Sequence, residues 1–164
     1  MSKTIIIYYS YGTHTKMIAE EIQKELKCDL LEVKPVIPFS TDYDEVVAEY
    51  QNNECAKETP EIQKININLD DYDKIIIGTP VWWYTINPVI RTFLTKYDLS
   101  GKTVIPFATN AGWLGRSFKE IKSLCKNSKI ENEKSILFTT DHTENKLVTS
   151  EKEIQEWINE IKNN

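Results

Sequence analysis

The chain has 164 residues, of which 40% are hydrophobic and 27% charged, which suits one domain spanning 1–164 and excludes a disordered chain. Its net charge of −5, without a block of Lys and Arg, argues against nucleic acid and anionic membrane surfaces as partners. No apolar run approaches the roughly 20 residues of a membrane span, no N-terminal signal pattern is present, and three widely spaced cysteines favour a reducing cytoplasm.

Strand-like and helix-like patterns alternate along the chain. Short runs of β-branched, aliphatic and aromatic residues predict strands at 3–9, 29–33, 73–78, 103–108 and 135–140. Amphipathic patterns and capping signals predict helices that end near Leu26, begin at Pro88, span 114–125 and begin after Ser150. Five strands that alternate with helices predict a parallel sheet with helices on both faces.

The segment 34–68 is less regular than the rest of the chain. It begins with Pro35 and Pro38, which exclude a regular helix at that point. Asp42 is typical of an N-cap, and the apolar face that follows predicts a second helix. We interpret the segment as a long crossover between the second and third strands, in which Phe39 and Tyr43 are candidates to cover a neighbouring site.

The loop after the first strand is rich in hydroxyl side chains and leads into a helix. In an open parallel sheet, ligands bind beyond the carboxyl ends of the strands. The candidate residues in this loop are Ser10, Gly12, Thr13, His14 and Thr15. Hydroxyls beside the N–H groups of a helix N-terminus suit a phosphate dianion, although helix capping alone explains one of them. The loop matches neither the nucleoside-triphosphate nor the dinucleotide fingerprint, which disfavours both ligands.

The loop after the third strand is dominated by aromatic residues. Its candidate residues are Pro80, Trp82, Trp83 and Tyr84. Three consecutive aromatic side chains match neither the alternation of a core strand nor the spacing of a helix face. We interpret them as flat walls for a flat ligand, while one of the two tryptophans also suits packing under the following helix.

The loop after the fourth strand is built from small and polar residues. Its candidate residues are Thr109, Asn110, Ala111 and Gly112. Small residues let backbone groups approach the polar edge of a planar ligand, although a simple turn explains the same residues nearly as well. Together the three loops describe a phosphate pocket, an aromatic wall and a polar rim, a combination that fits flavin mononucleotide (FMN).

Three stretches resemble the flavodoxin family. Residues 6–22 resemble its apolar strand, phosphate loop and helix, but Gly12-Thr13 reverses the family's Thr-Gly and His14 replaces its Asn. Residues 71–83 resemble its Tyr-Asp-x-Ile-x-x-Gly-x-Pro-x-Trp segment, in the subgroup with Gly-x-Pro-x-Trp-Trp, and 102–110 resemble its fourth strand and flavin-side loop. The resemblance implies a flavodoxin-like three-layer α/β/α sandwich with a five-stranded parallel sheet in order 2-1-3-4-5.

The resemblance also implies a function. It implies an FMN-binding flavodoxin that acts as a low-potential electron-transfer protein, with a reductase and an acceptor as redox partner proteins. We expect a monomer with no catalytic residue and no metal site. The alternative is an FMN-dependent NAD(P)H:quinone or small-molecule reductase on the same fold, which the lack of a separate dinucleotide fingerprint weakens. A flavin-free signalling module is disfavoured, because Asp70, Asp71 and Asp73 precede the third strand instead of following it.

Overall fold

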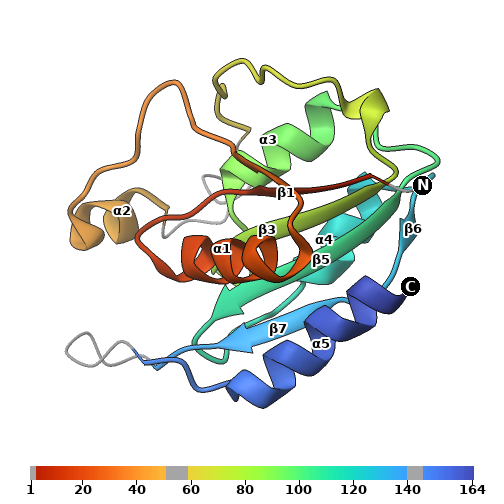
Figure 1. The fold of residues 1–164 in the computed structure, drawn as a ribbon. Coiled ribbons are helices and arrows are strands. Elements are labelled where there is room, and N and C mark those ends of the chain that lie inside the picture. Colours follow the sequence, from red (N-terminus) through yellow and green to blue (C-terminus); the bar gives the residue numbers. More distant parts are fainter. Residues whose placement is uncertain (1–2, 51–58, 140–145) are drawn as a thin grey trace.

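A sheet lies between two layers of helices in the computed structural model, which describes residues 3–50, 59–139 and 146–164 (Figure 1). The strands are β1 (Thr4–Tyr8), β2 (Asp29–Glu32), β3 (Lys74–Trp82), β4 (Thr85–Ile86), β5 (Thr103–Asn110), β6 (Lys129–Ile130) and β7 (Lys134–Leu137). The helices are α1 (His14–Leu26), α2 (Tyr43–Tyr50), α3 (Pro88–Lys96), α4 (Ser117–Leu124) and α5 (Glu151–Asn163). Helices α1 and α5 cover one face of the sheet and α3 and α4 cover the other, so the predicted three-layer sandwich is confirmed.

The strand order is β2-β1-β3-β5-β6, with β7 paired to the same edge of β5 as β6. This is the predicted order, except that two short strands share the place of the predicted fifth strand. Asn132, between these two strands, has a φ of 54° and interrupts the ladder. The predicted count of five is also exceeded by β4, which pairs antiparallel with the end of β3. Of the predicted fifth strand, residue 140 lies outside the described residues.

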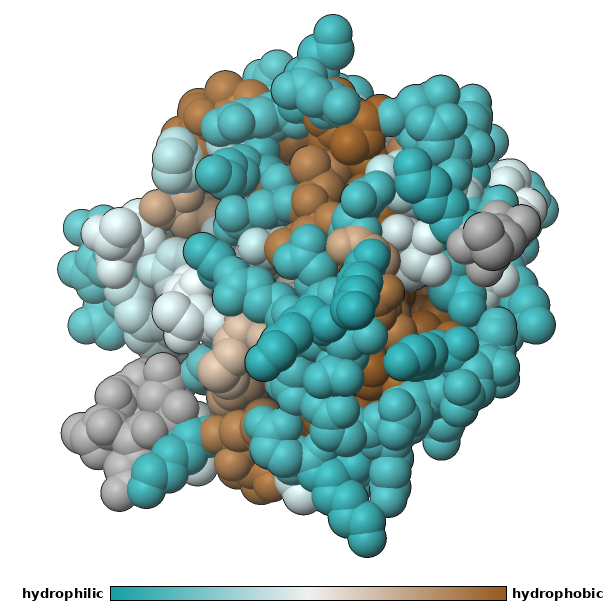
Figure 2. Space-filling model, viewed as in Figure 1, coloured by the Kyte–Doolittle hydropathy of each residue, from teal (hydrophilic) through white to brown (hydrophobic). Residues whose placement is uncertain are grey.

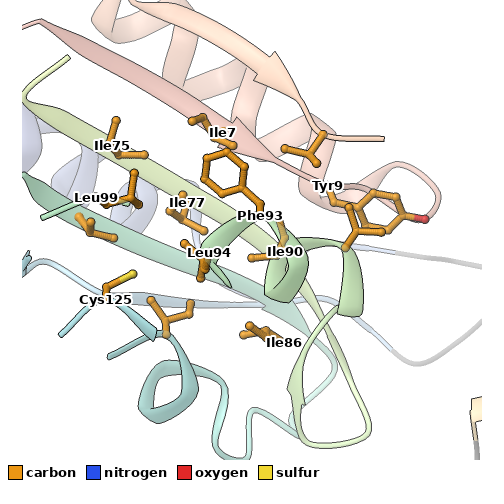
Figure 3. Close-up of a cluster of buried hydrophobic side chains, with 14 of the residues drawn as sticks. Ile7, Tyr9, Ile75, Ile77, Ile86, Ile90, Phe93, Leu94, Leu99 and Cys125 are labelled. Atoms are coloured by element: carbon orange, nitrogen blue, oxygen red, sulfur yellow. The ribbon is translucent and has the colours of Figure 1, made fainter. Parts of the chain in front are cut away.

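The core is divided by the sheet into two clusters, one on each face. Successive isoleucines of β1 point to opposite faces, as the alternation of a strand requires. Ile5 and Ile7 join the cluster under α3 and α4, and Ile6 joins the cluster under α1 and α5. Figure 3 shows the first cluster, where Ile7, Ile75 and Ile77 of the central strands face the α3 side chains Ile90, Phe93 and Leu94. Both faces of the central strands are therefore buried, which explains why their sequences are apolar throughout.

The starts of three helices show how local sequence determines their bounds. Helix α3 begins as predicted, because the Asn87 side chain accepts a hydrogen bond of 2.8 Å from Val89 N–H and Pro88 occupies the first helical position. Ser150 caps α5 in the same way. Helix α4 begins at Ser117 and not at residue 114, because Gly115 adopts a φ of 55° that no right-handed helix contains.

Hydrophilic residues cover most of the face that carries α1 and α5, with hydrophobic residues visible between them (Figure 2). The isoleucines of both helices turn inward, and Ile18, Ile22, Ile154 and Ile158 are almost completely buried. Within the described ranges, no helix has the length and apolar character that crossing a bilayer needs.

Candidate functional site

The carboxyl ends of β1, β3 and β5 meet at one edge of the sheet, since these strands are neighbours in parallel ladders. Tyr8 pairs with Gly78, Gly78 pairs with Phe107, and the β3–β5 ladder continues as far as Pro80 opposite Thr109. Pro80, Thr109 and Asn110, predicted in loops, therefore lie within strands that lead to those loops. The three predicted loops accordingly come together, at the position where open α/β sheets bind ligands.

The loop between β1 and α1 is shaped by the hydroxyl of Ser10. This hydroxyl donates to the Gly12 carbonyl oxygen at 3.1 Å and accepts the Lys16 N–H at 3.2 Å. Thr13 is the N-cap of α1, and in the described part of the chain its side chain makes no capping hydrogen bond. Ser10 therefore caps the Lys16 N–H, and the N–H groups of His14 and Thr15 at the very start of α1 face the loop, as an anion-binding helix N-terminus requires.

Thr15 connects this loop to the end of β5. Its hydroxyl forms a buried hydrogen bond of 2.8 Å with the hydroxyl of Thr109. Both side chains are nearly inaccessible, with 1% and 4% of their surface exposed. These two predicted residues are therefore in direct contact, and the bond keeps the first and third loops in register.

The ring of His14 stacks on that of Phe138. The two rings lie 3.8 Å apart at an interplanar angle of 4°. The Nε2 atom of His14 is buried, and within the described residues it has no hydrogen-bond partner. The group that His14 presents to the predicted phosphate site is thus its backbone N–H at the first position of α1.

The predicted aromatic loop is a tight β-hairpin. Strand β3 continues to Trp82, which pairs with Thr85 of β4, so that Trp83 and Tyr84 alone form the turn. Both turn residues have positive φ values, 49° and 66°. Two-residue hairpins favour this backbone, but it normally uses Asn and Gly, and each non-glycine residue in it costs about 1–2 kcal/mol. The turn is therefore a strained element that neighbouring structure must hold.

Trp82 is a packing residue and not an exposed wall. Only 9% of its surface is exposed, and it forms a cluster with Val46 of α2. Its ring lies 4.8 Å from that of Phe39 and 5.4 Å from that of Tyr11. Trp82 is thus the tryptophan of the run that packs, but it attaches α2 to the sheet instead of lying under α3.

An apolar pocket of about 390 Å³ lies at this edge of the sheet. It is lined by Tyr11, Tyr43, Val46, Val47, Val81, Trp82, Trp83, Tyr84 and Trp113. The volume lies within the range of small-molecule sites. Tyr43 is one of the two residues predicted to cover the site. Tyr11 and Trp113 are not among the predicted site residues, although both are aromatic and stand in the predicted loops. Trp113 is 62% exposed, and its ring lies edge-on to Tyr84 at 6.1 Å.

The loop after β5 is held by the side chain of Asn110. Its amide nitrogen donates to Ala108 O at 3.2 Å and to Ser135 Oγ at 2.9 Å, and its amide oxygen accepts Gly112 N–H at 2.9 Å. Ala111 and Gly112 are exposed. The carboxamide thus shapes the predicted polar rim, and the backbone of the two small residues is what remains accessible to a ligand.

Tyr11 links the phosphate loop to the segment that carries α2. Its hydroxyl donates a hydrogen bond of 2.6 Å to the Ser40 carbonyl oxygen. We expect Tyr11→Phe to speed hydrogen exchange of the α2 amides about fivefold, because one hydrogen bond contributes about 1 kcal/mol. Tyr72→Phe is the matched control, since it removes a 2.6 Å bond to Asp29 at the other end of the sheet. Equal α2 exchange in both variants would contradict this link.

Fold and site together define a flavodoxin-like α/β protein, with a helix N-terminus and an aromatic pocket at the carboxyl edge of a parallel sheet. A family model described as Flavodoxin matches residues 3–161, and the chain belongs to this family. No curated protein gives a significant sequence match.

Solved structures agree with this assignment. A Bacteroides eggerthii protein is 28% identical, with 98% of each chain covered and a TM-score of 0.75. A Lactobacillus acidophilus flavoprotein in complex with FMN is 30% identical, covering 82% of this chain and 93% of that chain, with a TM-score of 0.68. Fusobacterium nucleatum flavodoxin bound to FMN shares the fold at 16% identity, covering 99% of this chain and 98% of that chain, with a TM-score of 0.56.

Proposed function

We propose that this chain binds FMN and acts as a low-potential electron-transfer protein in the cytoplasm. The observation that carries the proposal is the combination of an anion-binding helix N-terminus and an apolar aromatic pocket at one edge of the sheet. A phosphate and a planar ring on one ligand match these two features. The FMN complex of the Lactobacillus acidophilus flavoprotein, at 30% identity, supports the same ligand.

The residues present fit FMN in both parts of the site. The loop of Ser10 to Thr15, with its backbone N–H groups, suits the phosphate. Trp83, Tyr84 and Trp113 suit the flat faces of the ring, and the backbone at Ala111 and Gly112 suits its polar edge. FMN supplies the redox chemistry when bound, and the protein supplies binding, orientation and electrostatics.

Charge and stacking both favour a low reduction potential. Aromatic walls stabilise a neutral oxidised ring, and a protein of net charge −5 disfavours additional negative charge on the ligand. The helix beside the pocket is itself acidic, since α2 and its cap carry Asp42, Asp44, Glu45 and Glu49 without a basic residue. The partners that suit this acidic surface are redox proteins, a reductase and an acceptor, each with a basic face of its own. This chain would meet them as a monomer.

Flavin binding by the purified protein tests the proposal directly. FMN added to apoprotein is expected to lose fluorescence and to bind with one site per chain, and riboflavin is expected to bind more weakly. A protein that binds neither flavin contradicts the proposal. Steady oxidation of NAD(P)H with an added quinone, without any partner protein, would favour the reductase alternative over the electron carrier.

Ser10→Ala separates the two halves of the site. The variant loses both hydrogen bonds of the Ser10 hydroxyl that shape the phosphate loop. We expect its affinity for FMN to fall by a factor of about 5–30, equivalent to about 1–2 kcal/mol, and its affinity for riboflavin to stay unchanged. Ser128→Ala, which removes a 2.6 Å bond to Leu99 O away from the site, is the control and leaves both affinities unchanged. An equal loss for both flavins in Ser10→Ala would contradict the phosphate assignment.

A further inference from the structure

A buried ion pair lies behind the aromatic turn, outside the lining of the pocket. Arg91 of α3 donates from Nε to Glu120 Oε2 at 2.5 Å and from Nη2 to Glu120 Oε1 at 2.9 Å. The two side chains are only 8% and 15% exposed. Such a two-pronged contact fixes the orientation of the carboxylate as well as its position.

The same carboxylate holds the strand that follows the turn. The Thr85 hydroxyl donates to Glu120 Oε1 at 2.5 Å, and Arg91 Nη2 lies 3.5 Å from the Ile86 carbonyl oxygen. Thr85 and Ile86 are the whole of β4, which begins directly after Trp83 and Tyr84. Glu120 thus joins α3 and α4 to the outgoing arm of the turn.

The turn itself is held from the segment leading into α4. Arg116 N–H donates to the Tyr84 carbonyl oxygen at 2.7 Å. Gly115 packs so closely on Tyr84 that a side chain there would overlap its backbone. Residues at both ends of one short stretch, 115–120, therefore restrain two aromatic residues whose left-handed backbone is unfavourable without such support.

We propose that Glu120 is a positioning residue, which holds the strained Trp83–Tyr84 turn in the geometry that the flavin ring stacks against. This inference rests on the proposed function. Glu120 does not line the pocket, so it acts on the ring through Thr85 and the turn, not by contact. It predicts that Glu120 influences the affinity for the ring and its reduction potential, and not the affinity for the phosphate.

Glu120 keeps its charge in this environment. Burial acts to raise the pKa of its carboxyl group, but hydrogen bonds from Arg91 and Thr85 and the charges of Arg91 and Arg116 lower the pKa overall. A neutral glutamine at this position keeps the size of the side chain and loses the charge that anchors Arg91. Glu120→Gln is therefore the informative substitution.

We expect Glu120→Gln to weaken FMN and riboflavin binding by the same factor, about tenfold, which is the scale of the strain at one left-handed residue. The reduction potential of bound flavin is expected to rise, because a looser aromatic wall stabilises the oxidised ring less. In the apoprotein, the Arg116 amide is expected to exchange its hydrogen faster, since its acceptor is the Tyr84 carbonyl. Unchanged ring affinity, potential and Arg116 exchange in a folded Glu120→Gln protein would overturn the proposal, leaving a pair that only stabilises the fold.

Two further variants complete the test. Glu133→Gln removes the acceptor of the 3.1 Å ion pair with Lys122, also on α4, and is expected to change none of the three readouts. Thr85→Val keeps the buried ion pair and removes only its link to the turn. It is expected to shift all three readouts in the direction of Glu120→Gln, so it tests the proposal even if that variant fails to fold. If the wild type binds no flavin, the proposed function fails, while Arg116 exchange in the apoprotein still decides whether Glu120 restrains the turn.

Discussion

The Gly115→Ala variant is expected to lose about 2–4 kcal/mol of folding free energy and to bind flavin at least about tenfold more weakly. Gly115 adopts a φ of 55°, where an alanine costs about 1–2 kcal/mol. A methyl group there would also overlap the backbone of Tyr84, and relieving that overlap costs about 1–2 kcal/mol more. The overlap pushes the turn away from the start of α4, and so disturbs the wall of the ring pocket.

Gly101→Ala is the matched control for this variant. Gly101 has a φ of 79°, but a methyl group there would meet no atom within 4 Å. Urea unfolding of both proteins measures the shared backbone cost and the additional overlap cost separately, and riboflavin binding reports the pocket. Gly101→Ala is expected to lose about 1–2 kcal/mol with unchanged flavin affinity. Equal stability and equal flavin affinity of the two variants would show that the Gly115–Tyr84 contact has no influence on the site.

The layers and strand order were predictable because the central strands are apolar on both faces. Three isoleucines in β1 and three in β3 stand opposite one another in the ladder, from Ile5 with Ile75 to Ile7 with Ile77. A strand of this kind needs cover on both sides, which a parallel sheet between two helical layers provides. The three ligand loops followed from the same topology, since they end neighbouring parallel strands.

The hairpin was not predictable from local sequence. Trp83 and Tyr84 are strand-forming residues, and no turn rule places two aromatics in a left-handed turn. Their conformation depends on contacts from Glu120 and Arg116, about thirty residues later in the chain. The same applies to Trp82, whose burial depends on where the long crossover places Val46. Local patterns therefore located the site, while long-range contacts determined which aromatic residue is available to a ligand.

Gly78→Ala is expected to destabilise the fold by about 1–3 kcal/mol, because the central strand has no room for a side chain at this position. A methyl group on Gly78 would overlap the ring of Phe107, its ladder neighbour on β5. Phe107 has little freedom to move, since it is fully buried and its ring lies 5.9 Å from that of Trp157 on α5. Urea unfolding of the variant measures the cost.

A double-mutant cycle with Phe107→Leu shows whether this overlap is the cause. Leucine removes the ring atoms that a methyl group on Gly78 would meet, at the cost of a cavity beside Trp157. The double variant is therefore expected to lose less folding free energy than the two single variants lose together, with a coupling energy of about 0.5–3 kcal/mol. Gly101→Ala combined with Phe107→Leu is expected to be additive, because a methyl group on Gly101 meets nothing. Additivity in the Gly78 cycle as well would mean that Gly78 is needed for the backbone of β3 and not for the close approach of Phe107.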